Sequence, residues 1–145
     1  MPAKLVVGID GSGSGGRALD YAKKLAGLID ACEIIVVYVI EWSPYSFQTP
    51  EENAERHKRR EEEIHAARER IIDPAVKALA QAGFTARGVV RHGDVAEMID
   101  HTAKDEKADQ IIVARSAEGK FSQRLFGTAT VKLVMHASVP VTVVK

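Results

Sequence analysis

The sequence predicts an α/β fold: one domain, residues 1–145, with a parallel β-sheet between two layers of helices. Short runs rich in valine and isoleucine alternate with longer segments whose apolar residues recur at helical spacing. Two of the runs, EIIVVYVIE and QIIVAR, are almost continuously apolar, which is typical of parallel strands buried on both faces. The length of 145 residues suits a single domain with its own core.

Five segments are expected to form the strands, because each is a short run of mainly β-branched residues. They are residues 4–10, 33–41, 85–91, 110–115 and 139–144. Parallel strands need crossover connections, and right-handed crossovers place helices on both faces of the sheet. The predicted architecture is therefore a three-layer α/β/α sandwich of the Rossmann-like kind.

Four apolar stripes indicate the helices and the faces that they bury. Pro74 lies inside the second helical pattern and should kink or split that helix near Asp73. Residues 42–50 are expected to form a loop, and the charged residues after it a solvated helix face. The stripes are Ala18, Tyr21, Ala22, Leu25 and Leu28 or Ile29; Ile64, Ala67, Ile71, Ala75 and Leu79; Val95, Met98, Ile99 and Thr102; and Val131, Val134 and Met135.

The composition argues against several classes of protein. Twenty basic and twenty acidic residues cancel, so neither nucleic acid nor direct membrane insertion is expected. The single cysteine, Cys32, and an N-terminal apolar run too short for a signal peptide or a membrane span favour the cytoplasm. The five histidines lack partners at metal-site spacing, so no metal site is predicted.

The glycine-rich segment GIDGSGSGGRAL follows the first expected strand and can be interpreted in three ways. Its spacing Gly11-x-Gly13-x-x-Gly16 matches a dinucleotide-binding turn, but the motif alone is a weak signal and the chain has no length for a substrate domain. A phosphate loop of the Walker A type fails, because Arg17 and Ala18 stand at its lysine and hydroxyl positions. In the third interpretation the glycines only turn the chain, and Asp10 at the strand end faces the ligand.

The last third of the chain favours the third interpretation. The segments ADQIIVARSAEGKFSQRLFGTATVKLVMHASVPVTVV, LVVGIDGS and HGDVAEMIDHTAKDEKADQIIV together resemble the universal stress protein family over nearly the whole chain. The resemblance implies a five-stranded parallel sheet in the order 3-2-1-4-5. The order reverses between the first and fourth strands, which is where a nucleotide is expected to bind.

ATP-binding members of that family carry G-x-x-G-x9-G-[S/T] after the fourth strand. Gly127-Thr128 preserves the final pair, whereas Ala114 and Ala117 replace the two earlier glycines. An alanine that needs a positive φ, or whose methyl group points at a phosphate, costs about 1–2 kcal/mol, whereas one with an ordinary φ and a methyl group that points away costs nothing. The sequence leaves both outcomes open.

The resemblance also implies which residues surround the nucleotide. Asp10 would lie beside the ribose, and Val39 would pack on the adenine. Arg115 can neutralise phosphate charge or form an ordinary salt bridge, and both interpretations stay open. The predicted nucleotide-binding residues are Gly8, Ile9, Asp10, Val39, Ala114, Arg115, Ser116, Ala117, Gly127, Thr128, Ala129 and Thr130.

The last strand is apolar and lies at a sheet edge in the implied order, and an exposed apolar edge invites pairing. Family members pair this strand across a two-fold axis, so the resemblance implies a homodimer. The expected interface residues are Pro140, Val141, Thr142, Val143 and Val144.

The function expected from these patterns is that of a cytoplasmic stress-response regulator that binds ATP or AMP. No catalytic arrangement is visible, so any ATP hydrolysis is expected to be slow and incidental. Magnesium is expected only together with the nucleotide. The alternative is a dimeric adaptor that binds no nucleotide and acts on a partner such as a transporter or kinase.

Overall fold

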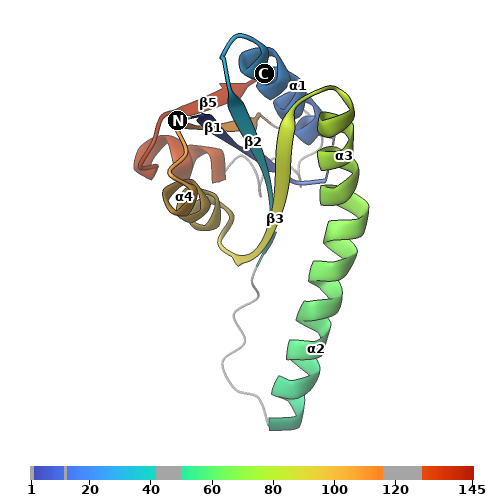
Figure 1. The fold of residues 1–145 in the computed structure, drawn as a ribbon. Helices are drawn as coiled ribbons and strands as arrows, with labels where there is room; N and C mark the ends of the chain where they lie inside the picture. The colour runs from blue at the N-terminus through green and yellow to red at the C-terminus, as the bar shows by residue number, and fades with distance from the viewer. Residues whose placement is uncertain (1, 12, 42–49, 116–128) are drawn as a thin grey trace.

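The computed structural model of the chain describes residues 2–11, 13–41, 50–115 and 129–145. Its core is a five-stranded parallel sheet with the order β3-β2-β1-β4-β5 (Figure 1), which confirms the predicted fold class and strand order. Each expected strand overlaps an observed one. The strands are β1 (Ala3–Ile9), β2 (Cys32–Glu41), β3 (Thr85–Gly93), β4 (Gln110–Ala114) and β5 (Val141–Val144).

Helices cover both faces of the sheet. Figure 1 shows α4 and helical residues 129–136 on one side, and α1 and α3 on the other. The helices are α1 (Gly13–Gly27), α2 (Pro50–Ala67), the π-helical turn η1 (Arg68–Ile72), α3 (Asp73–Gln81) and α4 (Val95–Glu106).

The two faces of the sheet hold two separate cores, as a doubly covered parallel sheet requires. On the α4 face, Val6 of β1 packs in a cluster with Ile99 and Leu133. On the α1 face, Val7 packs in a second cluster that includes Ala22 and Leu79. Successive residues of β1 therefore enter opposite cores, which is why Leu5, Val6 and Val7 are all apolar and buried.

The split predicted near Asp73 is present and takes the form of a π-helical turn. Pro74 has no N–H to continue the α-helical pattern, and the N–H of Asp73 instead bonds the carbonyl of Arg68, five residues earlier. The turn presses Ile72 against β3, where a Cβ added to Gly88 would lie 2.1 Å from Ile72 Cγ2. The long helix therefore docks on the sheet through the last turns of α2, where Ala67 is buried and Glu63 lies 3.4 Å from His92 of β3, and through η1 and α3.

The first turns of α2 extend beyond the sheet (Figure 1). Their side chains are mostly exposed and pair along the helix, as His57 does with Glu61 at 3.2 Å. This confirms the expected solvated helix face. The prediction that Pro50 belongs to a loop is wrong, because Pro50 begins α2, where its missing N–H has no helical partner to lose.

Two parts of the predicted stripes face solvent. Of the alternatives Leu28 and Ile29 at the end of the first stripe, Ile29 is half-buried and Leu28 is 77% exposed, because α1 ends at Gly27 and the chain turns there. The stripe on residues 129–136 also faces solvent, with Val131, Val134 and Met135 exposed by 63%, 61% and 70%. This helix packs on the sheet through its opposite side, where Leu133 is buried.

Candidate functional site

The point at which the strand order reverses lies between β1 and β4. The two strands pair through Leu5–Gln110, Val6–Ile111 and Val7–Ile112, and the pairing stops there. Each strand nevertheless continues for two more residues, to Ile9 and Ala114. The backbone groups at these strand ends are therefore no longer engaged with each other, which is the expected place for a ligand in an open α/β sheet.

Asp10 follows the last residue of β1 and is half-buried. Its carboxylate lies close enough to Tyr38 of β2 to affect that phenol. Burial, together with the charges of Asp10 and Glu63, raises the pKa of Tyr38 above its usual value. The phenol of Tyr38, which is protonated at neutral pH like that of any ordinary tyrosine, offers a hydroxyl donor near Asp10.

Arg115 directly follows β4, and its backbone is fixed from two sides. Its N–H donates to the carbonyl of Val144 at 2.7 Å, and its own carbonyl accepts a hydrogen bond from the guanidinium of Arg17 on α1. The Nε of Arg17 is buried and finds no partner among the described residues. Two guanidinium-bearing residues thus meet at the end of β4.

The contribution of Arg17 was not predicted. In the sequence it appeared only as the residue that rules out a Walker A loop. The signal was nevertheless present, because α1 starts directly after the turn that carries Asp10, and a cation early in that helix lies near the neighbouring strand end.

The structure resolves the question that Ala114 left open. Ala114 is the last residue of β4 and pairs with Val144 in the sheet. Among the described non-glycine residues, positive φ values occur at Ala31 and Lys107, not at Ala114. Its methyl group is 1% exposed and packs in the core on the α1 face. Replacing glycine by alanine here therefore carries no backbone strain.

The other predicted pocket residues fall on the two faces of the sheet. Val39 and Ala129 belong to the core cluster on the α4 face, so both lie on the same side of the sheet. Gly8 faces the same side, where an added Cβ would lie 2.8 Å from Ile99 Cδ1. The side chain of Ile9 packs instead in the core on the α1 face, so only its backbone is available at the strand end.

Four predicted residues lie outside the described part of the chain, whereas Thr130 is half-buried in helix 129–136. The four are Ser116, Ala117, Gly127 and Thr128.

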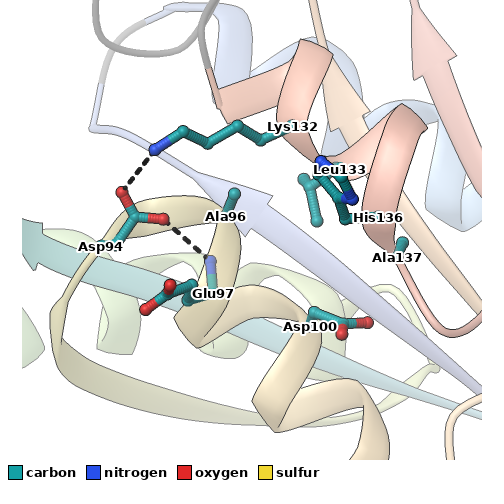
Figure 2. A pocket seen from close by; sticks show the side chains of 8 residues that line it. All are labelled: Asp94, Ala96, Glu97, Asp100, Lys132, Leu133, His136 and Ala137. Atoms are coloured by element: carbon teal, nitrogen blue, oxygen red, sulfur yellow. Dashed lines mark hydrogen bonds and ion pairs between the residues drawn. The ribbon is translucent and has the colours of Figure 1, made fainter.

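A groove of about 300 Å³ runs between α4 and helix 129–136 (Figure 2), and it begins at Asp94, which directly follows the end of β3. Asp94 caps the N-terminus of α4 by accepting a hydrogen bond from the N–H of Glu97 at 3.1 Å, and it also binds Lys132 at 3.1 Å. Partial burial opposes the charged form, but these contacts outweigh it and lower the pKa of Asp94. The lining residues are Asp94, Ala96, Glu97, Asp100, Lys132, Leu133, His136 and Ala137.

Two shallower hollows flank the turn after β1 on the face of the sheet that α1 and α3 cover. One, of about 270 Å³, lies beside Tyr38, and one of about 180 Å³ lies beside Gly11. Arg70 and Ile71 of η1 line both. The π-helical turn therefore forms a common wall next to the turn that carries Asp10.

Metal-ligating side chains do not gather in the described residues: no group of three or more histidine, cysteine, aspartate or glutamate residues lies together there. None of the described helices is long and apolar enough to cross a membrane.

Comparison with known proteins places the chain in a family. Its sequence matches the family model described as the universal stress protein family over residues 1–145. No curated protein matches the sequence.

Solved structures agree on the fold. The universal stress protein UspA from Lactobacillus plantarum has 20% sequence identity and a TM-score of 0.80, over 99% of this chain and 97% of that chain. A family protein from Arabidopsis thaliana, described with AMP bound, has 17% identity and a TM-score of 0.67, over 99% and 92% of the two chains. A universal stress protein in complex with cAMP has 22% identity and a TM-score of 0.62, over 99% and 96%.

Proposed function

Because the chain belongs to the universal stress protein family, we propose that it is a stress-response regulator that binds an adenine nucleotide where β1 and β4 end. One observation carries the proposal. The pairing of β1 with β4 stops two residues before either strand does, and the ends carry Asp10 on one side and Arg115 with Arg17 on the other.

The chemistry of these groups suits a nucleotide. A carboxylate accepts hydrogen bonds from ribose hydroxyls, and guanidinium groups bind phosphate oxygens in pairs. In this proposal Asp10 orients the ribose, and Arg17 and Arg115 offset the phosphate charge. Gly127-Thr128 would add backbone amides and a hydroxyl.

Similar proteins support the choice of ligand class. Two structures with this fold are described as complexes with AMP and with cAMP. The strain-free backbone of Ala114 removes one objection to binding at this place. ATP or AMP is the proposed ligand, and Mg²⁺ would enter only as a companion of the phosphates.

The proposed role is regulatory and not catalytic. A catalytic site would need an arranged base or nucleophile, and the groups at the strand ends are a carboxylate and two guanidinium groups suited to holding a ligand. The regulator would act in the cytoplasm as a homodimer paired through Pro140 and β5. Its output would be contact with a regulatory partner protein.

The test starts from the purified protein. It is denatured and any released nucleotide is identified; ATP, AMP and adenosine are then titrated calorimetrically into the stripped protein. Asp10→Ala should weaken binding of all three ligands. Arg17→Gln should weaken the binding of ATP by about tenfold, because the substitution removes one phosphate contact. The affinity for adenosine, which has no phosphate, should stay nearly unchanged.

Arg59→Gln is the matched control. It removes the same charge from an exposed position on α2 and should change none of the affinities. No released nucleotide, and no heat at millimolar ATP or AMP, would end the nucleotide proposal and leave the adaptor as the interpretation.

A further inference from the structure

The two hollows beside the turn after β1 share a wall that carries a guanidinium group. Arg70 and Ile71 of η1 line both of them. The first, of about 180 Å³, lies beside Gly11 and is called here the Gly11 hollow. The second, of about 270 Å³, lies beside Tyr38 and is called the Tyr38 hollow. A ligand that fills either hollow therefore meets Arg70.

The backbone at Arg70 is fixed by the two residues that follow it. Ile71 packs against the turn after β1, since a Cβ added to Gly11 would lie 3.2 Å from Ile71 Cδ1. Ile72 is buried and packs against Gly88 of β3. The π-helical turn is thus held by two neighbouring parts of the fold. Arg70 is therefore placed beside the Gly11 hollow without any segment having to order when a ligand binds.

The guanidinium of Arg70 has no partner of its own. No hydrogen bond or ion pair joins it to any residue in the described part of the chain. Arg17, by contrast, is engaged with the carbonyl of Arg115. Glu63, the acidic residue of the Tyr38 hollow, lies 3.4 Å from His92. Arg70 is therefore a cation that a ligand can engage without breaking an existing contact.

Charge distinguishes the two hollows. The Tyr38 hollow contains Glu63, whose carboxylate repels an anion. The described residues that line the Gly11 hollow include Arg70 and three glycines but no acidic residue. The volume of about 180 Å³ equals that of about six water molecules at about 30 Å³ each, which is enough for a phosphate group. The Gly11 hollow is therefore the one that suits an anion.

The position of the Gly11 hollow relates it to the proposed nucleotide site. Gly11 directly follows Asp10, and β1 lies between β2 and β4 in the sheet. Arg17 and Arg115 meet at the end of β4. Arg70 belongs to the long helix beside β3, and its turn contacts β2 and β3 (Figure 1). Cations therefore lie on both sides of Asp10, one set toward β4 and one toward β2.

We infer that the ligand of this site is a nucleotide with a second phosphate on its ribose, at the 2′ or the 3′ oxygen. The 5′ phosphate faces Arg17 and Arg115, and the second phosphate enters the Gly11 hollow, where Arg70 binds it. The inference rests on the proposed nucleotide site and names a narrower class of ligand for it.

The ribose connects the two phosphates. In the proposed function Asp10 accepts a hydrogen bond from a ribose hydroxyl, so the neighbouring ribose oxygen lies close to the turn after β1. A phosphate on that oxygen would be repelled by the carboxylate of Asp10, and Arg70 offsets the repulsion. A guanidinium suits this role, because it can donate two parallel hydrogen bonds to one phosphate group. A mononucleotide leaves Arg70 hydrated at the surface, at no cost to its own binding.

The test is calorimetric titration of the stripped protein with AMP, adenosine 3′,5′-bisphosphate and adenosine 2′,5′-bisphosphate. At least one bisphosphate should bind about tenfold or more tightly than AMP, because it gains a charge-assisted contact. Arg70→Gln should abolish this preference and leave the affinity for AMP within about twofold of the wild-type value. Arg68→Gln is the matched control, since Arg68 is exposed on the same turn but lines neither hollow. It should keep the full preference.

Charge reversal separates a lost contact from a lost fold. Arg70→Glu should bind the preferred bisphosphate more weakly than AMP, because like charges then meet in the Gly11 hollow. Arg70→Lys should keep part of the preference, because the charge remains but the paired geometry is lost. The midpoint of thermal unfolding should be the same in all these variants as in the wild type, since Arg70 is exposed and makes no contact with the described residues that the substitution removes.

The outcomes distinguish the inference from the proposal beneath it. AMP binding without a preference for either bisphosphate overturns the inference and leaves the proposed function standing, as does a preference that Arg70→Gln does not change. Absence of binding by all three ligands overturns both. Bisphosphate binding that Arg70→Gln removes supports the inference, even where AMP binds too weakly to measure.

Discussion

Asp100 on α4 accepts two hydrogen bonds from Ser138, one from its N–H at 2.9 Å and one from its hydroxyl at 2.8 Å. Ser138 lies two residues after helix 129–136. From the middle of the same helix, Lys132 binds Asp94, the N-cap of α4. Asp94 and Asp100 therefore hold the helix at its middle and just beyond its C-terminal end, in addition to its packing on the sheet.

Asp100→Ala should lower the free energy of unfolding by about 1–2 kcal/mol, because both donors of Ser138 lose a charged acceptor. Ser138→Ala removes only the hydroxyl and should cost about 0.5–1 kcal/mol. Urea denaturation measures both. Asp20→Ala, with a side chain 78% exposed on α1, should stay within about 0.5 kcal/mol of the wild type. An equal effect of Asp100→Ala and Asp20→Ala would mean that the contact contributes nothing.

Acid should weaken the contacts that Asp94 and Asp100 make with helix 129–136 and with Ser138, and should thereby lower the stability of the protein. Partial burial opposes the charged form of Asp100, but the hydrogen bonds from Ser138 and the nearby Lys104 outweigh it and lower the pKa of Asp100; that of Asp94 is lowered as well. Each group has a usual value of 3.8, so the unfolded chain binds more protons near that pH. The stabilisation is complete above this value and is lost as the pH falls through the lowered values.

The measurement is the free energy of unfolding between about pH 5 and pH 2. It should decrease steadily with acid in the wild type, and less steeply in Asp100→Asn, which no longer titrates at this position. Identical slopes for the two proteins would show that Asp100 does not contribute to the acid sensitivity.

The strands could be predicted from the sequence because β-branched runs buried on both faces have no competing pattern. The order of the strands came from the family resemblance and not from periodicity, since alternation of strands and helices does not say which strands are neighbours. The turn at Pro74 was also predictable, because a missing N–H acts locally.

Helix 129–136 shows that helical periodicity can identify an apolar face without identifying what covers that face. Its stripe of Val131, Val134 and Met135 correctly indicated an apolar face, but periodicity does not say whether the sheet or another molecule covers it. The sheet is covered instead by Ala129 and Leu133. The role of Arg17 could not be predicted from local sequence either, because Arg17 donates a hydrogen bond to the carbonyl of Arg115, which lies nearly a hundred residues away in the chain.

Ala114→Gly tests whether the altered family motif affects the ligand. The alanine has an ordinary strand backbone and a buried methyl group on the α1 face. Restoring glycine should therefore leave the affinities for ATP and AMP within about twofold of the wild-type values. It should lower the free energy of unfolding by about 0.5–1 kcal/mol, because glycine gives the unfolded chain more conformational freedom. Calorimetric titration and urea denaturation provide the two values. Tighter binding by tenfold in Ala114→Gly would mean that the methyl group obstructs the phosphates.

Gly88→Ala tests the docking of the π-helical turn on β3. The new Cβ would lie 2.1 Å from Ile72 Cγ2, so the helix or the strand must move, at a cost of about 1–3 kcal/mol. Gly27→Ala is the matched control, because nothing lies within 4 Å of its Cβ position. Its free energy of unfolding should equal or exceed that of the wild type.

The clash can be assigned to one atom by a double-mutant cycle. Ile72→Leu keeps the side-chain volume but removes the β-branch, and by itself should cost less than about 1.5 kcal/mol. If Cγ2 causes the strain, Gly88→Ala should be much less destabilising in the Ile72→Leu background than in the wild type. Additive effects would instead place the strain at Val76 of α3, whose Cγ2 lies 3.2 Å from the same Cβ position. Either result identifies which side chain holds the long helix against the sheet beside the turn that carries Asp10.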